Sequence, residues 1–282
     1  MAQARRLMRV YSSPTQYCER PLFKHLHIVA CSPRSGTTLL HEAMVTCFDV
    51  DRHFDHELRF NLVSGEPGEI VLTKRPKDTL YIQSLLADYT DFYVIYVLRD
   101  PRDVIVSRHG KDRDMYYSNI RLWRELHALA RPLADHPRFL TIRYEDFVSR
   151  PDEAQRAIEE RFPWLTRRYA FSEYHQHAVV SEKSKLAMHS VRPIAPTSIG
   201  RWRDNLARIK GQQQVHGSLT PDLIECGYET SSEWETLLDG VSADLSKSRY
   251  PETVGWPRRA LTALDGRRKL SAYRRRRRSA AG

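Results

Sequence analysis

Short apolar runs alternate with stretches of helical periodicity along most of the chain. The runs have the length and aliphatic content of buried parallel strands, and they cover residues 26–30, 69–73, 92–98 and 139–143. Helical spacing or helix-start signals occur between and after them, at residues 37–48, 79–87, 101–104, 116–130, 149–158, 202–209 and 221–227. This alternation predicts an α/β fold with a central parallel β-sheet flanked by helices on both faces.

The loop after the first predicted strand has the composition of a phosphate-binding turn. Its residues are Cys-Ser-Pro-Arg-Ser-Gly at positions 31–36, and a predicted helix begins directly after it. Backbone N–H groups of such a loop converge with the positive end of the helix dipole, and this arrangement suits a phosphate. The Walker pattern GxxxxGK[ST] is absent, because Cys31 replaces its first Gly and Ser35 replaces its Lys. Arg34 supplies the cation instead, and we expect a single P-loop-like domain.

A second anion-binding pattern follows the strand predicted at residues 92–98. Arg99 leaves the end of this strand, and Ser107 is expected two turns into the following helix. A guanidinium group and a hydroxyl group in these positions can hold one dianion together. Ligands of parallel sheets bind beyond the carboxyl ends of the strands, which is where both patterns lie.

Together the two patterns resemble the nucleotide site of sulfotransferases that use 3′-phosphoadenosine 5′-phosphosulfate (PAPS). The resemblance implies that Arg99 and Ser107 hold the 3′-phosphate. It also implies a set of residues that hold the 5′-phosphosulfate, namely Arg34, Ser35, Gly36, Thr37 and Thr38.

Two later segments extend this resemblance. Ile142-Arg143-Tyr144-Glu145-Asp146 resembles the family's Tyr-Glu-Asp segment, which implies that Tyr144 lies near the adenine. Ser198-Ile199-Gly200-Arg201-Trp202 resembles a segment that returns a cation to the 5′ side, which implies this role for Arg201.

The segment after the second predicted strand indicates the branch of the family. Cytosolic small-molecule sulfotransferases carry a catalytic His there and a Trp after the phosphate loop. This chain has Thr73-Lys74-Arg75-Pro76 and Leu39 at the two places. The chain is therefore more similar to the tyrosylprotein and carbohydrate branches. We expect a soluble, bacterial-type form that lacks the N-terminal membrane anchor of those branches.

This similarity implies the catalytic residues. Glu57 is the expected base, which takes the proton of the acceptor as the sulfur is attacked. Lys74 and Arg34 are the expected cations at the oxygen that leaves with the phosphate. His53 and His56 are alternatives to Glu57 as the base.

The net charge of +10 arises mostly at the C-terminal end. Ten Lys or Arg residues follow Pro257 against one acid, Asp265, which leaves a net charge near +1 on the rest of the chain. We predict an N-terminal arm (1–20), a sulfotransferase domain (21–230) and a C-terminal extension (231–282) whose Arg-rich end, Arg274–Gly282, is disordered. A weak contact of Arg274–Arg278 with an anionic membrane or another polyanion is compatible with this pattern, and specific nucleic-acid binding is not expected.

Cysteine usage and hydropathy predict the compartment. The four cysteines show neither CxxC spacing nor a paired His pattern, so we expect no zinc site, no disulfide framework and a reducing environment. The N-terminal arginines precede no apolar stretch, and no apolar run reaches membrane-spanning length. These observations predict a cytoplasmic protein.

The function that these features predict is sulfuryl transfer from PAPS to a hydroxyl or amine group by metal-independent in-line displacement. A carbohydrate or glycoconjugate is the favoured acceptor, while lipid-linked glycans, peptide tyrosine and small phenols stay open. Two alternatives remain at this point. One is a P-loop kinase, which the missing Walker Lys disfavours, and the other is a non-enzymatic protein that binds polyanions through its Arg-rich end.

Overall fold

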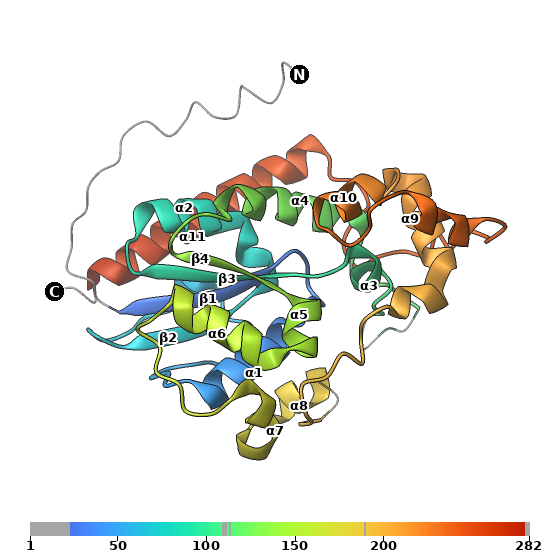
Figure 1. The fold of residues 1–282 in the computed structure, drawn as a ribbon. Helices are drawn as coiled ribbons and strands as arrows, with labels where there is room; N and C mark the ends of the chain where they lie inside the picture. Colours follow the sequence, from blue (N-terminus) through green and yellow to red (C-terminus); the bar gives the residue numbers. More distant parts are fainter. Residues whose placement is uncertain (1–22, 109–111, 113, 189, 280–282) are drawn as a thin grey trace.

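A parallel sheet of four strands, in the order β2-β1-β3-β4, forms the centre of the molecule (Figure 1). The computed structural model describes residues 23–108, 112, 114–188 and 190–279. Its strands are β1 (Lys24–Ala30), β2 (Ile70–Lys74), β3 (Phe92–Leu98) and β4 (Phe139–Arg143). All pairs are parallel, with Ile28 opposite both Lys74 and Ile95. The predicted α/β fold class is confirmed.

Helices cover both faces of the sheet (Figure 1). One face packs on α1 (Thr37–Cys47), α5 (Tyr144–Ser149) and α6 (Pro151–Arg161), and the other on α2 (Ile82–Asp88), α4 (Ile120–Ala130) and α11 (Trp256–Ser279). Side chains of β3 alternate between the two cores, because successive residues of a strand point to opposite faces. Ile95 and Val97 face the first group of helices, and Val94 and Tyr96 face the second.

Short helices complete the rest of the described chain. They are α3 (Pro101–Ile105), α7 (Tyr174–His177), α8 (Glu182–Met188), α9 (Leu206–His216) and α10 (Thr220–Glu225), together with the 3₁₀ turns η2 (Phe60–Leu62), η3 (Pro76–Tyr81), η4 (Arg131–Leu133), η5 (Phe171–Glu173), η6 (Arg201–Asn205) and η7 (Glu233–Leu238). Among the described residues, no helix is both long enough and apolar enough to cross a membrane.

Two predicted helix boundaries differ from the observed ones because of capping. The helix predicted at 116–130 begins at Ile120, since the Asn119 side chain accepts a hydrogen bond from the Leu122 N–H (3.0 Å) and so fixes the first turn. The helix predicted from Ser149 begins at Pro151, a residue that favours the first helical position because it lacks an N–H.

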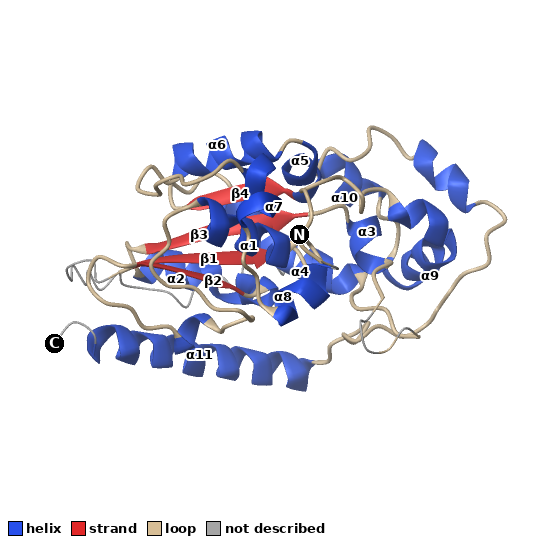
Figure 2. Cartoon of the chain, turned by 90° about the horizontal axis from the view of Figure 1, so that it is seen from below, coloured by secondary structure: helices blue, strands red, loops and turns tan. Residues whose placement is uncertain are grey.

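The predicted disorder of the Arg-rich end is wrong for Arg274–Arg278, which belong to α11. Tyr273 and Arg277 lie one turn apart on the face of α11 that packs on the sheet layer, and both are buried. The Tyr273 hydroxyl hydrogen-bonds His25 Nδ1 of β1 at 2.8 Å, and Arg277 forms an ion pair with Asp91. Figure 2 shows the resulting long helix along one side of the molecule. Two buried anchors therefore order a segment whose composition alone indicates a solvated tail.

The predicted N-terminal arm (1–20) and residues 280–282 lie outside the described residues. Residues after 230 contribute to the sheet layer, because Tyr273 belongs to the same apolar cluster as Phe92 and Trp123. The division of the chain at residue 230 stays a prediction.

We expect Arg277→Gln to lower the free energy of unfolding by about 3 kcal/mol, because it breaks the buried ion pair between Arg277 and Asp91. Arg276→Gln is the matched control, since Arg276 is exposed on the same helix and should change stability by about 0.5 kcal/mol or less. Urea denaturation of both variants measures the difference. Equal, small losses would show that the ion pair does not hold α11.

Candidate active site

The carboxyl ends of the four parallel strands meet at one edge of the sheet, and the predicted site residues follow these ends. The loop 31–36 leaves β1 there, and its first N–H, that of Cys31, donates to the Val97 carbonyl of β3 at 3.0 Å. Arg34 and Gly36 both adopt left-handed backbone conformations, with φ of 75° and 92°. Gly36 is the N-cap residue of α1 and provides no side-chain cap. The first-turn N–H groups of α1 therefore have no capping side chain and suit an anion.

Gly36 is required here because Tyr144 packs directly against it. A Cβ atom on Gly36 would lie 2.4 Å from Cδ2 of Tyr144, a distance that real Cβ contacts do not show. Tyr144 begins α5 immediately after β4, and its ring stacks under the Arg99 guanidinium, with Cζ 4.0 Å from the ring centroid. The tyrosine is thus held between the phosphate loop and the first residue after β3.

Arg99 connects three segments of the site. Its Nη1 donates to the Arg34 carbonyl at 2.9 Å and its Nη2 to the Ser198 carbonyl at 2.6 Å. Its Nε is buried and has no hydrogen-bond partner. A buried charged donor without an acceptor is energetically unfavourable. An oxygen atom of an anionic ligand at this place would supply the acceptor.

Arg34 and Ser107 also meet, as Arg34 Nε donates to the Ser107 hydroxyl at 2.9 Å. The structure corrects the position of Ser107, since α3 ends at Ile105 and Ser107 lies in the loop beyond it. Its N–H donates to the Val104 carbonyl at 3.3 Å in a last tight turn, so the hydroxyl still points back to the phosphate loop. Five of the predicted residues therefore form one cluster, namely Arg34, Gly36, Arg99, Ser107 and Tyr144.

The other predicted loop residues have more local roles in the structure. The Ser35 hydroxyl donates to the Ser32 carbonyl at 2.7 Å and contacts the Cys31 sulfur at 3.2 Å. Burial raises the pKa of the Cys31 thiol to about 11, so this sulfur stays protonated and packs rather than reacts. Thr37 and Thr38 lie in the first turn of α1, where their N–H groups point to the same place as those of the loop.

Lys74 ends β2 and is buried beside α1. Its Nζ lies 3.6 Å from Oε1 of Glu42, which also accepts from the Ser184 hydroxyl (2.8 Å) and contacts His41 Nδ1 (3.2 Å). Burial lowers the pKa of Lys74, while the charges of Glu42 and Glu57 act to raise it. The pKa of Glu42 is lowered although burial acts to raise it, because His41, Ser184 and Lys74 stabilise the carboxylate.

Glu42 is a site residue that sequence analysis missed. It lies on the buried side of α1 together with Leu40 and Ala43, and it is only 5% exposed. A carboxylate among apolar positions of an amphipathic helix is the signal that was available, because a buried acid needs a partner.

Glu57 lies in the loop between α1 and β2, and the residue is exposed. Partial desolvation of its carboxyl raises the pKa of Glu57, and the charges of Arg75 and Lys74 act in the opposite direction. Glu57 is therefore in electrostatic range of Lys74. Its alternatives are also exposed, and the ring of His53 lies 6.1 Å from that of His41.

Among the predicted site residues, Arg201 has the least direct connection to the cluster at the strand ends. It is exposed, and its Nε and Nη2 donate to the Thr197 carbonyl at 3.3 and 3.2 Å. Its segment is nevertheless fixed at the site, because the Asp103 carboxylate accepts from the N–H groups of Gly200 (2.8 Å) and Trp202 (3.0 Å). The cation thus lies next to the carbonyl of Ser198, which Arg99 binds.

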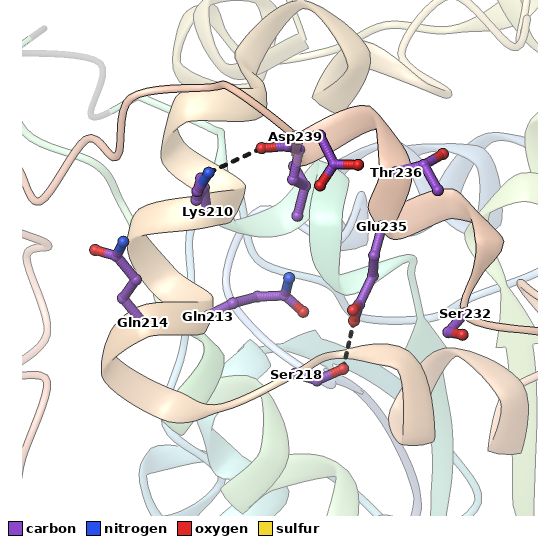
Figure 3. A pocket seen from close by; sticks show the side chains of 9 residues that line it. Lys210, Gln213, Gln214, Ser218, Ser232, Glu235, Thr236 and Asp239 are labelled. Atoms are coloured by element: carbon purple, nitrogen blue, oxygen red, sulfur yellow. Dashed lines mark hydrogen bonds between the residues drawn. The ribbon is translucent and has the colours of Figure 1, made fainter.

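An open groove of about 500 Å³ lies elsewhere, between α9 and η7 (Figure 3). None of the predicted site residues lines it. Two of its polar side chains are already bound within the protein, as Lys210 Nζ donates to the Leu238 carbonyl at 2.9 Å and Ser218 donates to Glu235 at 2.5 Å. This groove is therefore separate from the cluster at the strand ends.

The model of a family described as "Sulfotransferase family" matches residues 47–165. Within residues 47–165 the chain is therefore similar to the sulfotransferase family. The match includes Arg99, Ser107 and Tyr144 and begins after the phosphate loop. This match favours a sulfotransferase over the kinase and polyanion-binding alternatives.

Several solved structures are similar to this chain. The sulfotransferase domain of the Synechococcus PCC 7002 olefin synthase has 14% identity over 69% of this chain and 91% of that domain, with a TM-score of 0.44. The sulfotransferase domain from the curacin biosynthetic pathway has 12% identity over 66% and 98%, with a TM-score of 0.36. A retinol dehydratase in complex with androsterone and the inactive cofactor PAP has 13% identity over 90% and 81%, with a TM-score of 0.29. No curated protein matches the sequence.

We expect Gly36→Ala to destabilise the protein more than Gly240→Ala does. Both glycines have a positive φ, which costs a non-glycine residue about 1–2 kcal/mol, but only a Cβ at Gly36 meets another side chain. Displacement of Tyr144 should add about 1–3 kcal/mol. Urea denaturation of the two variants measures the difference, and equal losses would mean that Tyr144 does not constrain the loop.

Proposed function

We propose that this sulfotransferase transfers the sulfuryl group of PAPS to a hydroxyl or amine group of a carbohydrate or glycoconjugate. The observation that carries the proposal is the position of Arg99. This buried cation binds the phosphate loop and stacks on Tyr144, and its Nε has no partner within the protein. A nucleotide with two separate phosphate groups would satisfy this cation and the loop at the same time.

The residues present fit this co-substrate. The 5′-phosphosulfate would lie on the N–H groups of the loop and of Thr37 and Thr38, next to Arg34. The 3′-phosphate would be held by Arg99 and Ser107, and the adenine would lie near Tyr144. Arg34 contacts Ser107 directly, so the residues assigned to the two phosphate ends of one nucleotide lie within reach of each other.

When bound, the co-substrate would supply an activated sulfuryl group, which passes in line to the acceptor. A bond forms between the acceptor oxygen and sulfur, and the bond between sulfur and the phosphate oxygen breaks. Glu57 takes the proton of the acceptor hydroxyl. Lys74 and Arg34, with Arg201 nearby, stabilise the negative charge on the oxygen that leaves with adenosine 3′,5′-bisphosphate, as cations do in phosphoryl transfer.

Glu42 supports this chemistry as a positioning residue. Its carboxylate is the nearest anion to Lys74, and it keeps a buried ammonium group protonated that burial alone would tend to neutralise. The hydrogen bond from Ser184 ties α8 to the same carboxylate.

The choice of a carbohydrate acceptor depends on the similarity to the carbohydrate branch. The Lys74-Arg75-Pro76 segment and the polar loop with His53, His56 and Glu57 support it. Polar side chains of this kind can hydrogen-bond the several hydroxyl groups of a sugar.

We expect Arg99→Gln to weaken binding of adenosine 3′,5′-bisphosphate about 10–150-fold, because hydrogen bonds to charged groups contribute about 1.5–3 kcal/mol. Ser107→Ala should weaken it by about tenfold or less, because it removes one neutral hydroxyl. Calorimetric titration of the full chain measures both, with Arg156→Gln on the exposed side of α6 as a control that should bind normally.

The same titration with ATP and Mg²⁺ tests the alternative donor. Micromolar binding of the bisphosphate without metal, lost in Arg99→Gln, supports PAPS. A preference for ATP with Mg²⁺ would overturn the proposal in favour of a kinase.

We expect a bell-shaped dependence of kcat on pH. Because the pKa of Glu57 is raised, the base becomes protonated, and activity falls, as pH drops through a range above that of an ordinary glutamate. Because the pKa of Lys74 is lowered, the cation is lost, and activity falls, as pH rises through a range below that of an ordinary lysine. Initial rates of sulfate transfer between pH 4 and 11 measure both limbs.

Substitutions at Glu57 and Glu42 assign the acid and alkaline limbs of the pH profile. Glu57→Gln should lower kcat about 10²–10⁴-fold and remove the acid limb, whereas His53→Asn and His56→Asn should keep it. Glu42→Gln should move the alkaline limb to lower pH, because Lys74 loses a charge that raises its pKa. Near-full turnover of Glu57→Ala would remove Glu57 from the role of base.

A further inference from the structure

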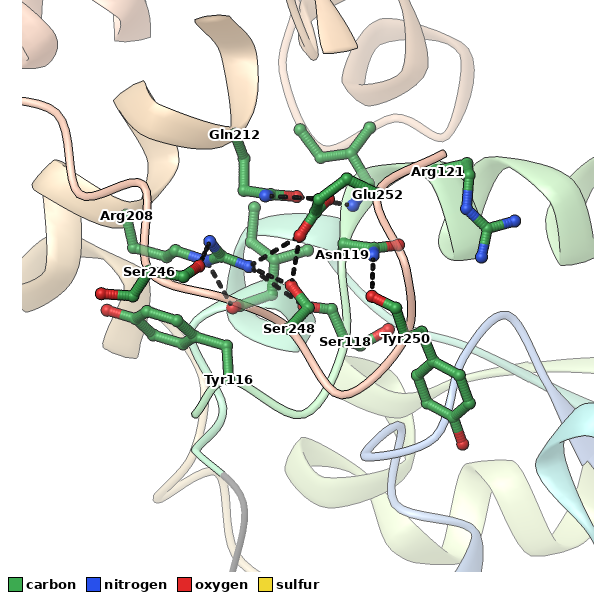
Figure 4. A network of polar contacts seen from close by, with 12 residues as sticks. Tyr116, Ser118, Asn119, Arg121, Arg208, Gln212, Ser246, Ser248, Tyr250 and Glu252 are labelled. Atoms are coloured by element: carbon green, nitrogen blue, oxygen red, sulfur yellow. Dashed lines mark hydrogen bonds and ion pairs between the residues drawn. The ribbon is translucent and has the colours of Figure 1, made fainter. Parts of the chain in front are cut away.

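A segment near the C-terminus, residues 244–252, lies across the loop that precedes α4; we refer to it as the strap (Figure 4). Two backbone hydrogen bonds join it to this loop, from Tyr116 to Lys247 (3.1 Å) and from Arg249 to Tyr116 (2.9 Å). The Asn119 side chain donates to the carbonyls of Tyr250 (2.9 Å) and Pro251 (3.2 Å). The backbone around Arg249 and Tyr250 is therefore fixed.

Buried polar contacts with α9 hold the strap from its other side (Figure 4). Arg208 of α9 is almost fully buried and donates to the Ser246 carbonyl (2.9 Å) and to the Ser248 hydroxyl (2.6 Å). Glu252 accepts from Ser248 (2.6 Å) and binds His216 of α9 (2.7 Å). These hydrogen bonds outweigh the effect of burial and lower the pKa of Glu252 to about 2, so the carboxylate stays ionised at neutral pH.

The strap places two side chains next to the proposed active site. Arg249 Nη1 donates to the Tyr117 hydroxyl at 2.9 Å, and the rings of Tyr117 and Tyr250 lie 6.2 Å apart. Tyr117 lies beside the phosphate loop, with Arg34 Cζ 5.9 Å from its ring centroid. In Figure 4 the ring of Tyr250 points away from the buried network, and Lys77 Nζ lies 4.7 Å from its centroid.

The charges around these two rings are mostly positive. Arg249, Lys77 and Arg75 are grouped there, and Glu57 and Arg75 are both in electrostatic range of the Tyr250 hydroxyl. Arg75 has a carboxylate, Asp78, at 3.7 Å, but its Nη1 is buried without a hydrogen bond. Burial lowers the pKa of Lys77, and the nearby charge of Arg75 lowers it further.

Arg75 and Arg249 both act on the carboxylate of Glu57, and Lys77 lies over the ring of Tyr250. A group of neighbouring cations becomes more favourable when an anion is bound between them. Arg99 and Ser107 are assigned to the nucleotide, so these three belong to the acceptor side. Rings such as Tyr117 and Tyr250 offer flat apolar surface with a polar edge, which suits the face of a sugar ring.

We propose that the strap completes the acceptor site and selects a sugar that carries an anionic group near the hydroxyl to be sulfated. Arg75, Lys77 and Arg249 bind the anionic group, and Tyr117 and Tyr250 bind the ring. This inference rests on the proposed function, since it places the acceptor between the phosphate loop and Glu57.

The test compares two probes that share one aglycone, 4-methylumbelliferyl β-D-glucuronide and 4-methylumbelliferyl β-D-glucoside. They differ in a carboxylate against a CH₂OH group. With PAPS as donor, we expect kcat/KM to be about tenfold or more higher for the glucuronide. Arg249→Gln and Lys77→Gln should each lower kcat/KM for the glucuronide about tenfold more than for the glucoside.

Two further variants separate charge from packing. Arg249→Lys should keep much of the preference, because it retains the positive charge, and Arg156→Gln on α6 should keep all of it. Three outcomes would overturn the inference. They are equal kcat/KM for the two probes, a preference for the glucuronide that survives both Arg249→Gln and Lys77→Gln, and no transfer to either probe at millimolar concentration. Binding of adenosine 3′,5′-bisphosphate that depends on Arg99 would still support the donor site, so the two failures are distinguishable.

Discussion

The arrangement of the active site depends on one buried cation. Arg99 leaves β3 into the protein interior, where a guanidinium group is costly unless acceptors and rings surround it. The carbonyls of Arg34 and Ser198 and the ring of Tyr144 supply part of that environment. Each of these three contacts comes from a different segment. The contacts that stabilise the Arg99 guanidinium therefore also fix the phosphate loop, the start of α5 and the segment before η6. The free Nε leaves the arrangement incomplete until an anion arrives.

The same logic applies on the other side of α1. Lys74 is buried at the end of β2, and Glu42 of α1 is the anion that accompanies it. Because α1 also begins with the phosphate loop, one helix positions both the anion-binding N–H groups and the carboxylate that keeps Lys74 charged. A local movement of α1 would therefore displace these N–H groups and this carboxylate together.

The C-terminal quarter of the chain is part of this structure rather than an appendage. Its strap is tied to α9 through Arg208 and Glu252, and its last helix is anchored on the sheet layer through Tyr273 and Arg277. Most of the basic residues that give the chain its net charge lie on this helix, yet the arginine that matters for the fold is the buried one. The net charge of this helix comes mainly from its exposed arginines, whereas its attachment to the sheet layer depends on the ion pair of the buried Arg277 with Asp91.

The sequence by itself determined the strands, the phosphate loop and the residues next to strand ends, because these features are local. Apolar runs of strand length, small residues before a helix, and Arg99 directly after β3 need only a few neighbouring positions to be recognised. The parallel sheet then brings Arg34, Arg99 and Tyr144 together, since all carboxyl ends meet at one edge.

Only the tertiary structure decided the roles of Glu42, Arg249 and Arg277. Each acquires its function from a partner far along the chain: Lys74 for Glu42, Tyr117 for Arg249 and Asp91 for Arg277. Composition around Arg277 indicated a solvated tail, because a run of arginines is normally exposed. The role of a buried charge depends on its partner, and no local pattern of hydrophobic and polar positions specifies a partner that lies from about thirty to nearly two hundred residues away.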